Sequence, residues 1–215
     1  MKILMTGSSG FIGRNLVQHL SERSDIEIIP FSHNQDLTEL SRSVADADAI
    51  VHLAGVNRPT DPSAFDEGNA TYTAALCSAI NESAKSGKAP TEIIYASSIQ
   101  AALDNGYGRS KRNAEDALKA LQAQTGIVVH IFRLVNVFGK WCRPNYNSAV
   151  ATFCHNLHHG LPLQINDANA ALSLVYIDDV VASFIDALDG KPIKKDVNSY
   201  SQIEREYKTT VGEVA

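Results

Sequence analysis

The sequence predicts an α/β fold built on a doubly wound parallel sheet. Apolar segments with the length of buried strands alternate with segments of helical periodicity almost to the end of the chain. This alternation is typical of right-handed βαβ crossovers, whose helices cover both faces of a parallel sheet. A glycine-rich loop also joins the first strand to the first helix. At 215 residues and 44% hydrophobic content, the chain can form one core of this kind.

The first strand, Lys2–Thr6, runs directly into the loop Gly7-Ser8-Ser9-Gly10-Phe11-Ile12-Gly13, and a helix follows. Gly7 permits the tight turn, Gly10 lets backbone N–H groups approach a pyrophosphate, and Gly13 lets the helix and strand pack closely. Any strand-to-helix turn can be glycine-rich, so a purely structural loop is the alternative. The strand before it and the helix after it favour a Rossmann-type dinucleotide-binding loop, with Phe11 and Ile12 also against the cofactor.

The remaining strands are expected at Ile26–Phe31, Ala49–Leu53, Glu92–Ala96, Ile127–Phe132 and Leu172–Tyr176. The remaining helices are expected at about Ser63–Lys85, Tyr107–Gln124, Ser148–His159 and Asp178–Leu188. Pro30 weakens the end of its strand, Asn105 can cap a helix start, and Gly126 can end that helix. The stretch from Val135 to Asn147 is expected to be irregular.

We expect one domain over residues 1–215, with residues from about 136 to 215 forming a small C-terminal substrate-binding region. Ligands of open α/β sheets bind at the carboxyl edge of the strands, which this last third is expected to cover. The chain finishes at Thr210–Ala215 with a helix start and no stop signal, which favours a longer natural polypeptide.

Composition excludes several classes of partner. The formal net charge is −5, with Lys and Arg scattered singly, so we expect no nucleic-acid or membrane surface. No apolar segment has the length of a signal peptide or membrane span. The three cysteines, Cys77, Cys142 and Cys154, are odd in number and lack CxxC spacing, which predicts reduced thiols and a cytoplasmic location.

Tyr107 and Lys111 are placed four residues apart, on one face of a predicted helix. A nearby ammonium stabilises a phenolate, which lowers the phenol pKa from about 10 and lets it exchange a proton with a carbonyl oxygen. The same spacing is common on solvated helix faces. Ser97-Ser98 follows the fourth strand at the same edge of the sheet, where a serine hydroxyl can hold that carbonyl oxygen, and this favours a catalytic set.

These motifs, with His52-Leu53-Ala54-Gly55, Asn136 and Tyr176-Ile177-Asp178-Asp179, resemble those of extended short-chain dehydrogenase/reductases that act on nucleotide sugars. The segments Val51–Pro59, Ser97–Ala101 and Phe138–Ser148 further resemble the reductase domain of CapF-type capsular polysaccharide and O-antigen enzymes. The resemblance implies NADPH-dependent reduction of the 4-keto group of a UDP-2-acetamido-2,6-dideoxy-hexulose, on the route to UDP-N-acetyl-L-fucosamine. Members usually carry a C-terminal zinc-binding cupin domain that epimerises the keto sugar. This sequence has no cupin, so epimerisation is not carried over.

The resemblance also implies roles for single residues. Ser98 takes the catalytic serine position, Tyr107 is the acid, and Lys111 holds the cofactor ribose and lowers the phenol pKa. Further contacts are implied with the cofactor at Leu53, Ala54 and Gly55, and with the substrate near its diphosphate at Asn136. Ser97 is expected to be a hydrogen-bonding residue at the strand end.

The end of the second strand, Phe31-Ser32-His33-Asn34, lacks a carboxylate. A carboxylate there would bind the adenine ribose of NAD and repel a 2′-phosphate, so its absence favours NADPH over NADH. His33 is expected at the phosphate, with Arg14 close by on the first helix. The alternative is that His33 is a solvated loop histidine.

The loop Lys140–Asn147 carries the chain's one tryptophan and several donors. Trp141 could stack on uracil or the sugar while Lys140 and Arg143 meet the diphosphate, and Asn147 is included in the expected substrate site. The alternative is a loop that Trp141 pins into the core.

His155 and His159 lie four apart on a predicted helix, but no carboxylate with matching spacing accompanies them, so no metal site is expected. Two other functions stay open. One is an NAD-dependent nucleotide-sugar 4-epimerase, which can use the same catalytic residues, and the other is a non-catalytic NADP-binding module. A homodimer is expected, paired through the helices at 63–85 and 107–124.

Overall fold

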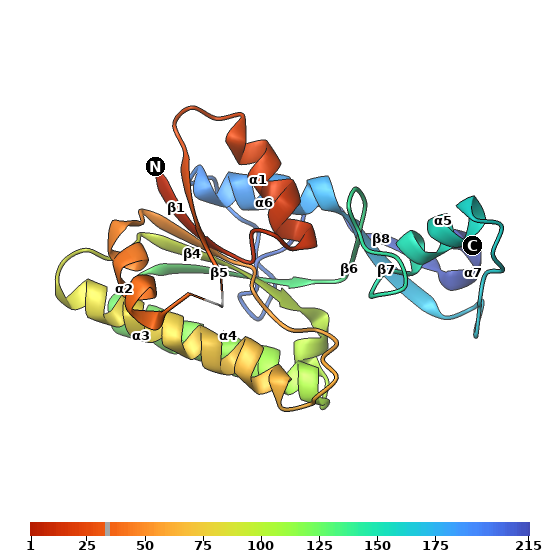
Figure 1. Ribbon diagram of the computed structural model, residues 1–215, viewed down its shortest axis with the longest axis horizontal. Coiled ribbons are helices and arrows are strands. Elements are labelled where there is room, and N and C mark those ends of the chain that lie inside the picture. The colour runs from red at the N-terminus through yellow and green to blue at the C-terminus, as the bar shows by residue number, and fades with distance from the viewer. Residues whose placement is uncertain (33–34) are drawn as a thin grey trace.

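The computed structural model describes residues 1–32 and 35–215 and has an α/β architecture (Figure 1). Its central sheet has five parallel strands in the order β2-β1-β3-β4-β5. These strands are β1 Lys2–Thr6, β2 Glu27–Phe31, β3 Ala49–His52, β4 Glu92–Ser98 and β5 Val128–Leu134. β2 lies at the edge, where Pro30 is tolerated because one side of the strand needs no ladder partner. The predicted fold class is confirmed.

Helices cover both faces of this sheet (Figure 1). One face carries α1 Phe11–Ser21 and α6 Ile177–Leu188, and the other carries α2 Leu37–Asp46, α3 Tyr72–Lys85 and α4 Gly106–Thr125. Successive side chains of β1 point to opposite faces of the sheet, so the strand contributes to the hydrophobic core on each face. Ile3 and Met5 are buried in the cluster that holds α1 and α6, whereas Leu4 is buried in the cluster that holds the other three helices.

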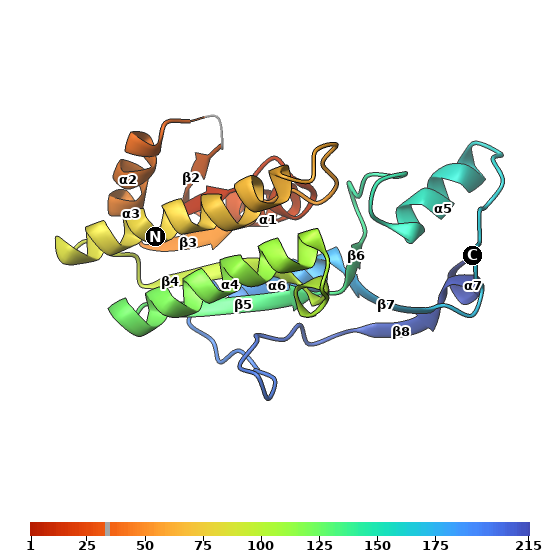
Figure 2. The same ribbon diagram turned by 90° about the horizontal axis from the view of Figure 1, so that it is seen from below.

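A second sheet extends from one end of the central body, together with two further helices (Figures 1 and 2). Its order is β6-β7-β8, with β6 Asn136–Phe138, β7 Ala171–Tyr176 and β8 Tyr207–Thr210; the helices are α5 Ala149–His158 and α7 Val211–Val214. Not all of residues 136–215 lies here. α6 packs on the central sheet, and the Ser201 N–H donates to the Ile131 carbonyl of β5 at 2.8 Å.

One helix, two strands and two short helical turns differ from the predicted elements. Asp36 caps α2 by accepting from the Thr38 N–H at 2.9 Å, and Leu40 and Val44 are buried, so the signals for this helix were present in the sequence. β6 and β8 form because they pair with β7, which is a tertiary contact that local pattern does not reveal. A π-helical turn, η1 Asp66–Thr71, precedes α3, and a 3-10 turn, η2 Ile99–Ala102, follows β4.

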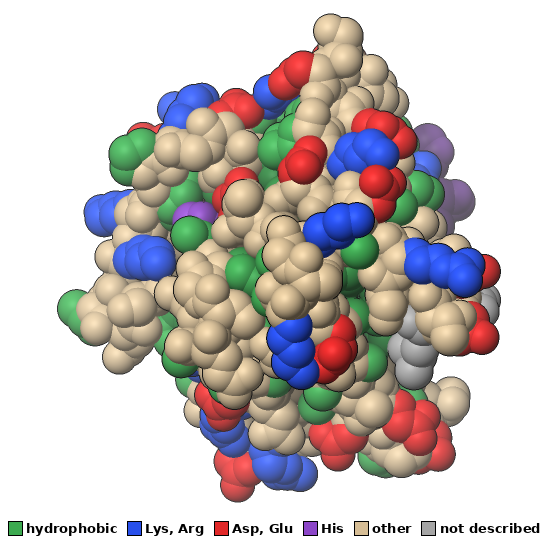
Figure 3. Space-filling model, turned by 90° about the vertical axis from the view of Figure 1, so that its left-hand side faces the viewer, with side chains coloured by type: hydrophobic (Ala, Val, Ile, Leu, Met, Phe, Trp, Pro, Cys, Tyr) green, Lys and Arg blue, Asp and Glu red, His purple; other side chains and the backbone are tan. Residues whose placement is uncertain are grey.

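The surface carries charges of both signs. On the face shown in Figure 3, basic and acidic side chains are interspersed. Across residues 1–32 and 35–215, none of the helices combines the length and the apolar character needed to cross a bilayer.

Candidate active site

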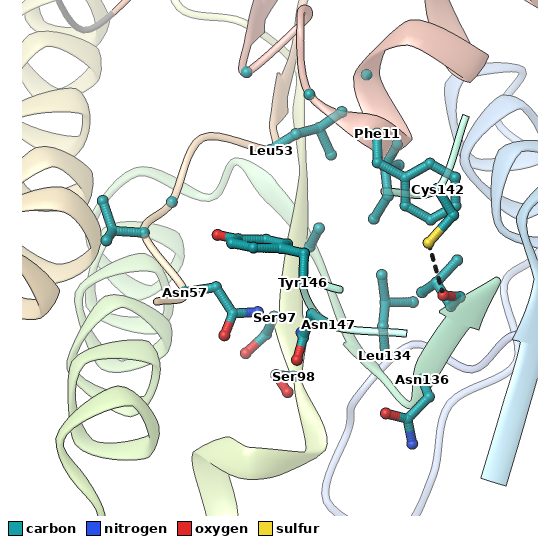
Figure 4. A pocket seen from close by; sticks show the side chains of 18 of the residues that line it. Phe11, Leu53, Asn57, Ser97, Ser98, Leu134, Asn136, Cys142, Tyr146 and Asn147 are labelled. Carbon is teal, nitrogen blue, oxygen red and sulfur yellow. Dashed lines mark hydrogen bonds between the residues drawn. The ribbon is translucent and has the colours of Figure 1, made fainter. Parts of the chain in front are cut away.

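A cavity of about 600 Å³ opens at the carboxyl ends of β1, β3 and β4 (Figure 4). The chain leaves β1 for β2 on one side and reaches β3 on the other, and such a switch point is where α/β sheets bind ligands. The predicted residues that line the cavity are Gly7, Gly10, Phe11, Ile12, Gly13, Leu53, Gly55, Ser98, Tyr107, Lys111, Asn136, Trp141, Arg143 and Asn147. Ala54 and Lys140 are not in its lining, and His33 lies outside the described residues.

The glycine loop has no space for side chains at two positions. Gly7 has a φ of +71°, and a Cβ there would lie 2.6 Å from the Ala54 nitrogen. A Cβ on Gly13 would lie 2.2 Å from the Gly7 carbonyl oxygen. Gly10 is the N-cap of α1 and offers no capping side chain, and the first turn has no acidic residue. The first turn of α1 lines the cavity, so its N–H groups suit a pyrophosphate.

Gly13→Ala is therefore expected to weaken NADPH binding about tenfold or more, because the new methyl group would displace the loop backbone. NADPH fluorescence titration measures this. Gly160→Ala is the control for a strained glycine substitution elsewhere, since Gly160 has a φ of +65° but lies outside the cavity. Equal NADPH affinity in the two variants would contradict this account of the loop.

Ser98, Tyr107 and Lys111 come together from the end of β4 and the start of α4. Asn105 caps α4 by accepting from the Gly108 N–H at 2.7 Å, which fixes the first turn of the helix. Lys111 is 4% exposed, and its Nζ donates to the Ala96 carbonyl at 2.8 Å. Ser98 and Tyr107 both line the cavity, and the Ser98 hydroxyl lies close enough to act on the Tyr107 pKa. The two hydroxyls can therefore meet a single carbonyl oxygen.

The expected lowering of the Tyr107 pKa by Lys111 is wrong for this structure. Burial raises the Tyr107 pKa, and only the hydrogen bond with Ser98 opposes this shift. Burial also lowers the pKa of Lys111 to about 7, so the side chain loses its proton, and with it its positive charge, near neutral pH. The Lys111 amine lies 4.3 Å from the Tyr95 ring centroid, and its hydrogen bond goes to the Ala96 carbonyl rather than to Tyr107.

His52 of the predicted family motif has a structural role. Its Nδ1 lies 2.7 Å from the Thr6 hydroxyl and its Nε2 lies 2.8 Å from the Thr73 hydroxyl. Burial lowers the His52 pKa to about 3, so the ring is neutral. Thr6 also accepts from the Ala54 N–H at 3.2 Å, which ties the ends of β1 and β3 behind the glycine loop.

Acid is expected to destabilise the protein through His52. Its folded pKa of about 3 lies below the ordinary value of 6.5, so its contribution is complete above pH 6.5 and is lost as the pH falls toward 3. At pH 5 the loss is about 2 kcal/mol. Urea unfolding at pH 7 and pH 5 should show this difference in the native protein and in His158→Asn, which removes an exposed histidine. The same difference in His52→Asn would contradict the assignment.

Trp141 lines the cavity and is 41% exposed, which contradicts a loop pinned in the core by this side chain. Its φ of 68° lies in the left-handed region, which is uncommon for non-glycine residues. The Arg14 guanidinium lies 4.8 Å from its ring centroid, and the Lys140 amine lies 4.6 Å away. Buried Asn15 donates to the Lys140 carbonyl at 3.0 Å and so ties this loop to α1.

Sequence reasoning missed two residues that shape the cavity. Asn69 of η1 bonds both backbone groups of Val56 and donates to the Ser110 hydroxyl, so it fixes the loop after β3 against α4. Tyr146 lines the cavity (Figure 4), with the Arg143 guanidinium 5.5 Å from its ring centroid. Nothing in the local pattern marks Asn69, whereas Tyr146 stood inside the predicted substrate loop.

The predicted substrate contact Asn136 lines the cavity and donates to the Ser173 carbonyl at 3.2 Å. Cys142 also lines it, with its Sγ 4.0 Å from the Val137 carbonyl oxygen (Figure 4).

The rings of His155 and His159 lie 4.1 Å apart, measured between their centroids. Within the part of the chain that the structure describes, no group of three or more His, Cys, Asp or Glu could hold a metal ion.

Comparison with known proteins adds to this geometry. Residues 3–198 match the model of the NAD dependent epimerase/dehydratase family. The chain is 50% identical over 216 residues to the UDP-2-acetamido-2,6-beta-L-arabino-hexul-4-ose reductase of Pseudomonas aeruginosa, and the match covers 100% of this chain and 56% of that protein. The chain is 26% identical over 227 residues to the UDP-glucose 4-epimerase of Vibrio cholerae, and that match covers 87% of this chain and 66% of the epimerase.

Among solved structures, the capsular polysaccharide assembling protein CapF from Staphylococcus aureus superposes with a TM-score of 0.86 at 39% identity, covering 100% of this chain and 56% of CapF. A UDP-glucuronic acid 4-epimerase from Bacillus cereus, solved with NAD, has a TM-score of 0.82 at 21% identity and shares the fold; the match covers 98% of this chain and 79% of the epimerase. The chain thus spans little more than half of its reductase and CapF relatives. With the family match and the glycine loop in agreement, the chain belongs to the NAD dependent epimerase/dehydratase family, the extended short-chain dehydrogenase/reductases.

Proposed function

We propose that this chain is the reductase part of an NADPH-dependent nucleotide-sugar 4-keto reductase. The observation that carries the proposal is one cavity lined by the glycine loop, Ser98, Tyr107 and Lys111. The proposed substrate is a UDP-2-acetamido-2,6-dideoxy-hexulose, in capsule or O-antigen sugar biosynthesis. It is supported by the name of the Pseudomonas aeruginosa relative, which is 50% identical over the whole of this chain.

In this proposal the residues of the chain divide the chemistry between them. When bound, the nicotinamide supplies the hydride that adds to C4 of the sugar. Tyr107 gives its proton to the carbonyl oxygen as the C–O double bond becomes single, and Ser98 hydrogen-bonds to the same oxygen. The raised Tyr107 pKa suits an acid, because the phenol stays protonated at neutral pH. Lys111 holds the cofactor ribose.

The proposed cofactor contacts comprise Gly7, Gly10, Phe11, Ile12, Gly13, His33, Leu53, Ala54, Gly55, Tyr107 and Lys111. Ala54 does not line the cavity, so its proposed role is indirect: its backbone packs against Gly7 and supports the glycine loop. The choice of NADPH over NADH is supported by the sequence at the end of β2. The first acid beyond it, Asp36, is used as the N-cap of α2.

The proposed substrate contacts are Asn136, Lys140, Trp141, Arg143 and Asn147. All except Lys140 line the cavity, and Lys140 stands beside the Trp141 ring. An exposed aromatic ring with two cations close to it suits a uracil base and a diphosphate.

A 4-epimerase is the second candidate, favoured by the match to the Vibrio cholerae enzyme. The two functions differ in net redox change. A reductase consumes NADPH in equal amount to the keto sugar, whereas an epimerase keeps its NAD and shows no net oxidation. Purified protein mixed with NADPH and the UDP-keto sugar should lose NADPH absorbance stoichiometrically, with NADH compared in parallel. Co-purified NAD and no consumption of either reduced cofactor would contradict the reductase.

Assembly and location stay predictions. We expect a homodimer paired through α3 and α4, which lie side by side on the outer surface of the sheet (Figures 1 and 2). The free thiols of Cys77, Cys142 and Cys154 are in keeping with a cytoplasmic enzyme. Light scattering on the purified chain measures the first of these.

A further inference from the structure

A third ionisable residue shares the helix face that carries the proposed catalytic pair. Tyr107, Lys111 and Glu115 follow one another at intervals of four along α4, so each lies one turn from the next. The Glu115 side chain is completely buried. Glu115 does not line the cavity, so it has no direct contact with the reacting groups in the proposed reaction.

Both carboxylate oxygens of Glu115 accept hydrogen bonds from residues of β4, of β5 and of the loop that holds Tyr200. Oε1 accepts from the Ser97 hydroxyl of β4 at 2.5 Å and from Arg133 Nε of β5 at 3.0 Å. Oε2 accepts from Arg133 Nη2 at 2.6 Å and from the Tyr200 hydroxyl at 3.1 Å. The Arg133 guanidinium also lies 3.8 Å from the Tyr200 ring centroid, and Lys119 donates to the Tyr200 hydroxyl.

Such a set of contacts keeps Glu115 ionised, because charge-assisted bonds offset the cost of burying a carboxylate. Stability alone is a weak reason for it, since apolar residues of similar volume often stabilise a core as well as a buried ion pair does. The contact with Ser97 gives a positional reason. Ser97 lines the cavity and is the neighbour of Ser98, so the carboxylate holds the end of β4 on which the catalytic serine position stands.

The charge of Glu115 bears on Lys111. Burial lowers the Lys111 pKa to about 7, and the Glu115 carboxylate opposes that shift. The other titratable groups near this amine are Tyr107 on its own helix, the Tyr95 ring of β4 and His52 of β3. Those phenols are protonated and His52 is neutral at pH 7, so none of them supplies a negative charge.

We propose that Glu115 is a positioning residue of the site, whose buried carboxylate, oriented by Arg133 and Tyr200, favours the ammonium form of Lys111 one helical turn away and holds Ser97 in place. The ammonium donates more strongly to ribose hydroxyls than a neutral amine does. This deepens the proposed function and rests on it for the role of Lys111.

NMR titration of Lys111 tests the inference directly, without cofactor or substrate. In protein with ¹³C-labelled lysine, the Lys111 signal is assigned by its loss in Lys111→Met, and its midpoint is measured in the native chain and in Glu115→Gln. We expect the midpoint to fall by about one pH unit in the variant. The control is Asp116→Asn, which removes the same charge from the adjacent, exposed position on α4 and should leave the midpoint unchanged.

Glu115→Gln leaves Arg133 without its partner, so the double variant Glu115→Gln/Arg133→Gln is measured beside it. It removes both charges of the pair, and a fall of the Lys111 midpoint is expected there too. A folded variant of either kind with the native midpoint would overturn the inference. Failure of the native chain to consume NADPH would contradict the proposed function instead, and the titration is independent of that result.

Discussion

Tyr107→Phe is expected to lower turnover roughly 10³-fold, because it removes the proton donor and leaves the ring in place. The phenol is half-buried in the cavity and its pKa is raised by burial, so it stays protonated at neutral pH and can serve as the donor. NADPH affinity should fall far less than turnover, since the glycine loop and Lys111, which make other proposed cofactor contacts, are untouched. Steady-state rates and NADPH fluorescence titration on the same preparation separate these two effects.

The control is Tyr207→Phe, which makes the same chemical change at an exposed position on β8 outside the cavity. It should retain native turnover. Native turnover in Tyr107→Phe itself would remove the acid from the proposed reaction.

Lys111→Met is expected to abolish turnover and to raise the free energy of unfolding at pH 7 by about 3 kcal/mol. The amine is 4% exposed, and its folded pKa of about 7 lies below the ordinary value of 10.5. The difference between these two pKa values means that burying the amine costs about 5 kcal/mol of folding free energy at pH 7. Loss of its hydrogen bond to the Ala96 carbonyl subtracts about 2 kcal/mol from the stability gained by the variant.

The sign of the pH dependence gives a second measurement. Between pH 7 and 10.5 the unfolded chain holds a proton on Lys111 that the folded chain has released, so native stability contributed by this residue rises with pH across that window. Urea unfolding at pH 7 and pH 9 should show this rise in the native protein and in the exposed-site control Lys88→Met, but not in Lys111→Met. A less stable Lys111→Met with unchanged pH dependence would contradict the account of this buried amine.

The sequence allowed the main sheet and most of the site to be predicted, because their signals are local. The glycine loop, the cap at Asn105, the left-handed Gly126 and the four-residue step from Tyr107 to Lys111 each follow from short-range geometry. The pair Ser97-Ser98 was found because it follows a buried strand at the carboxyl edge of the sheet, where ligands bind, and the choice of Ser98 came from the resemblance to the family. These features need no knowledge of distant contacts.

Other features depend on contacts between distant parts of the chain. β6 and β8 exist through their pairing with β7, and Asn69 matters through its bonds to Val56 and Ser110. The Lys111 pKa depends on how deeply α4 packs against β4, which spacing along a helix cannot tell. Glu115 lies four residues after Lys111, so the sequence places it on the same helix face, but its proposed role depends on hydrogen bonds from Arg133 and Tyr200, which are distant in the sequence.

Transfer of deuterium from labelled NADPH tests the central claim most directly. The UDP-keto sugar is incubated with the protein and NADPH that carries deuterium at the transferable position, with the two prochiral labels used in separate reactions. The account predicts one deuterium at C4 of the sugar product from one label only, together with one NADPH consumed per product molecule. A product without deuterium from either label, or deuterium at another carbon, would contradict hydride addition to a carbonyl held by Ser98 and Tyr107.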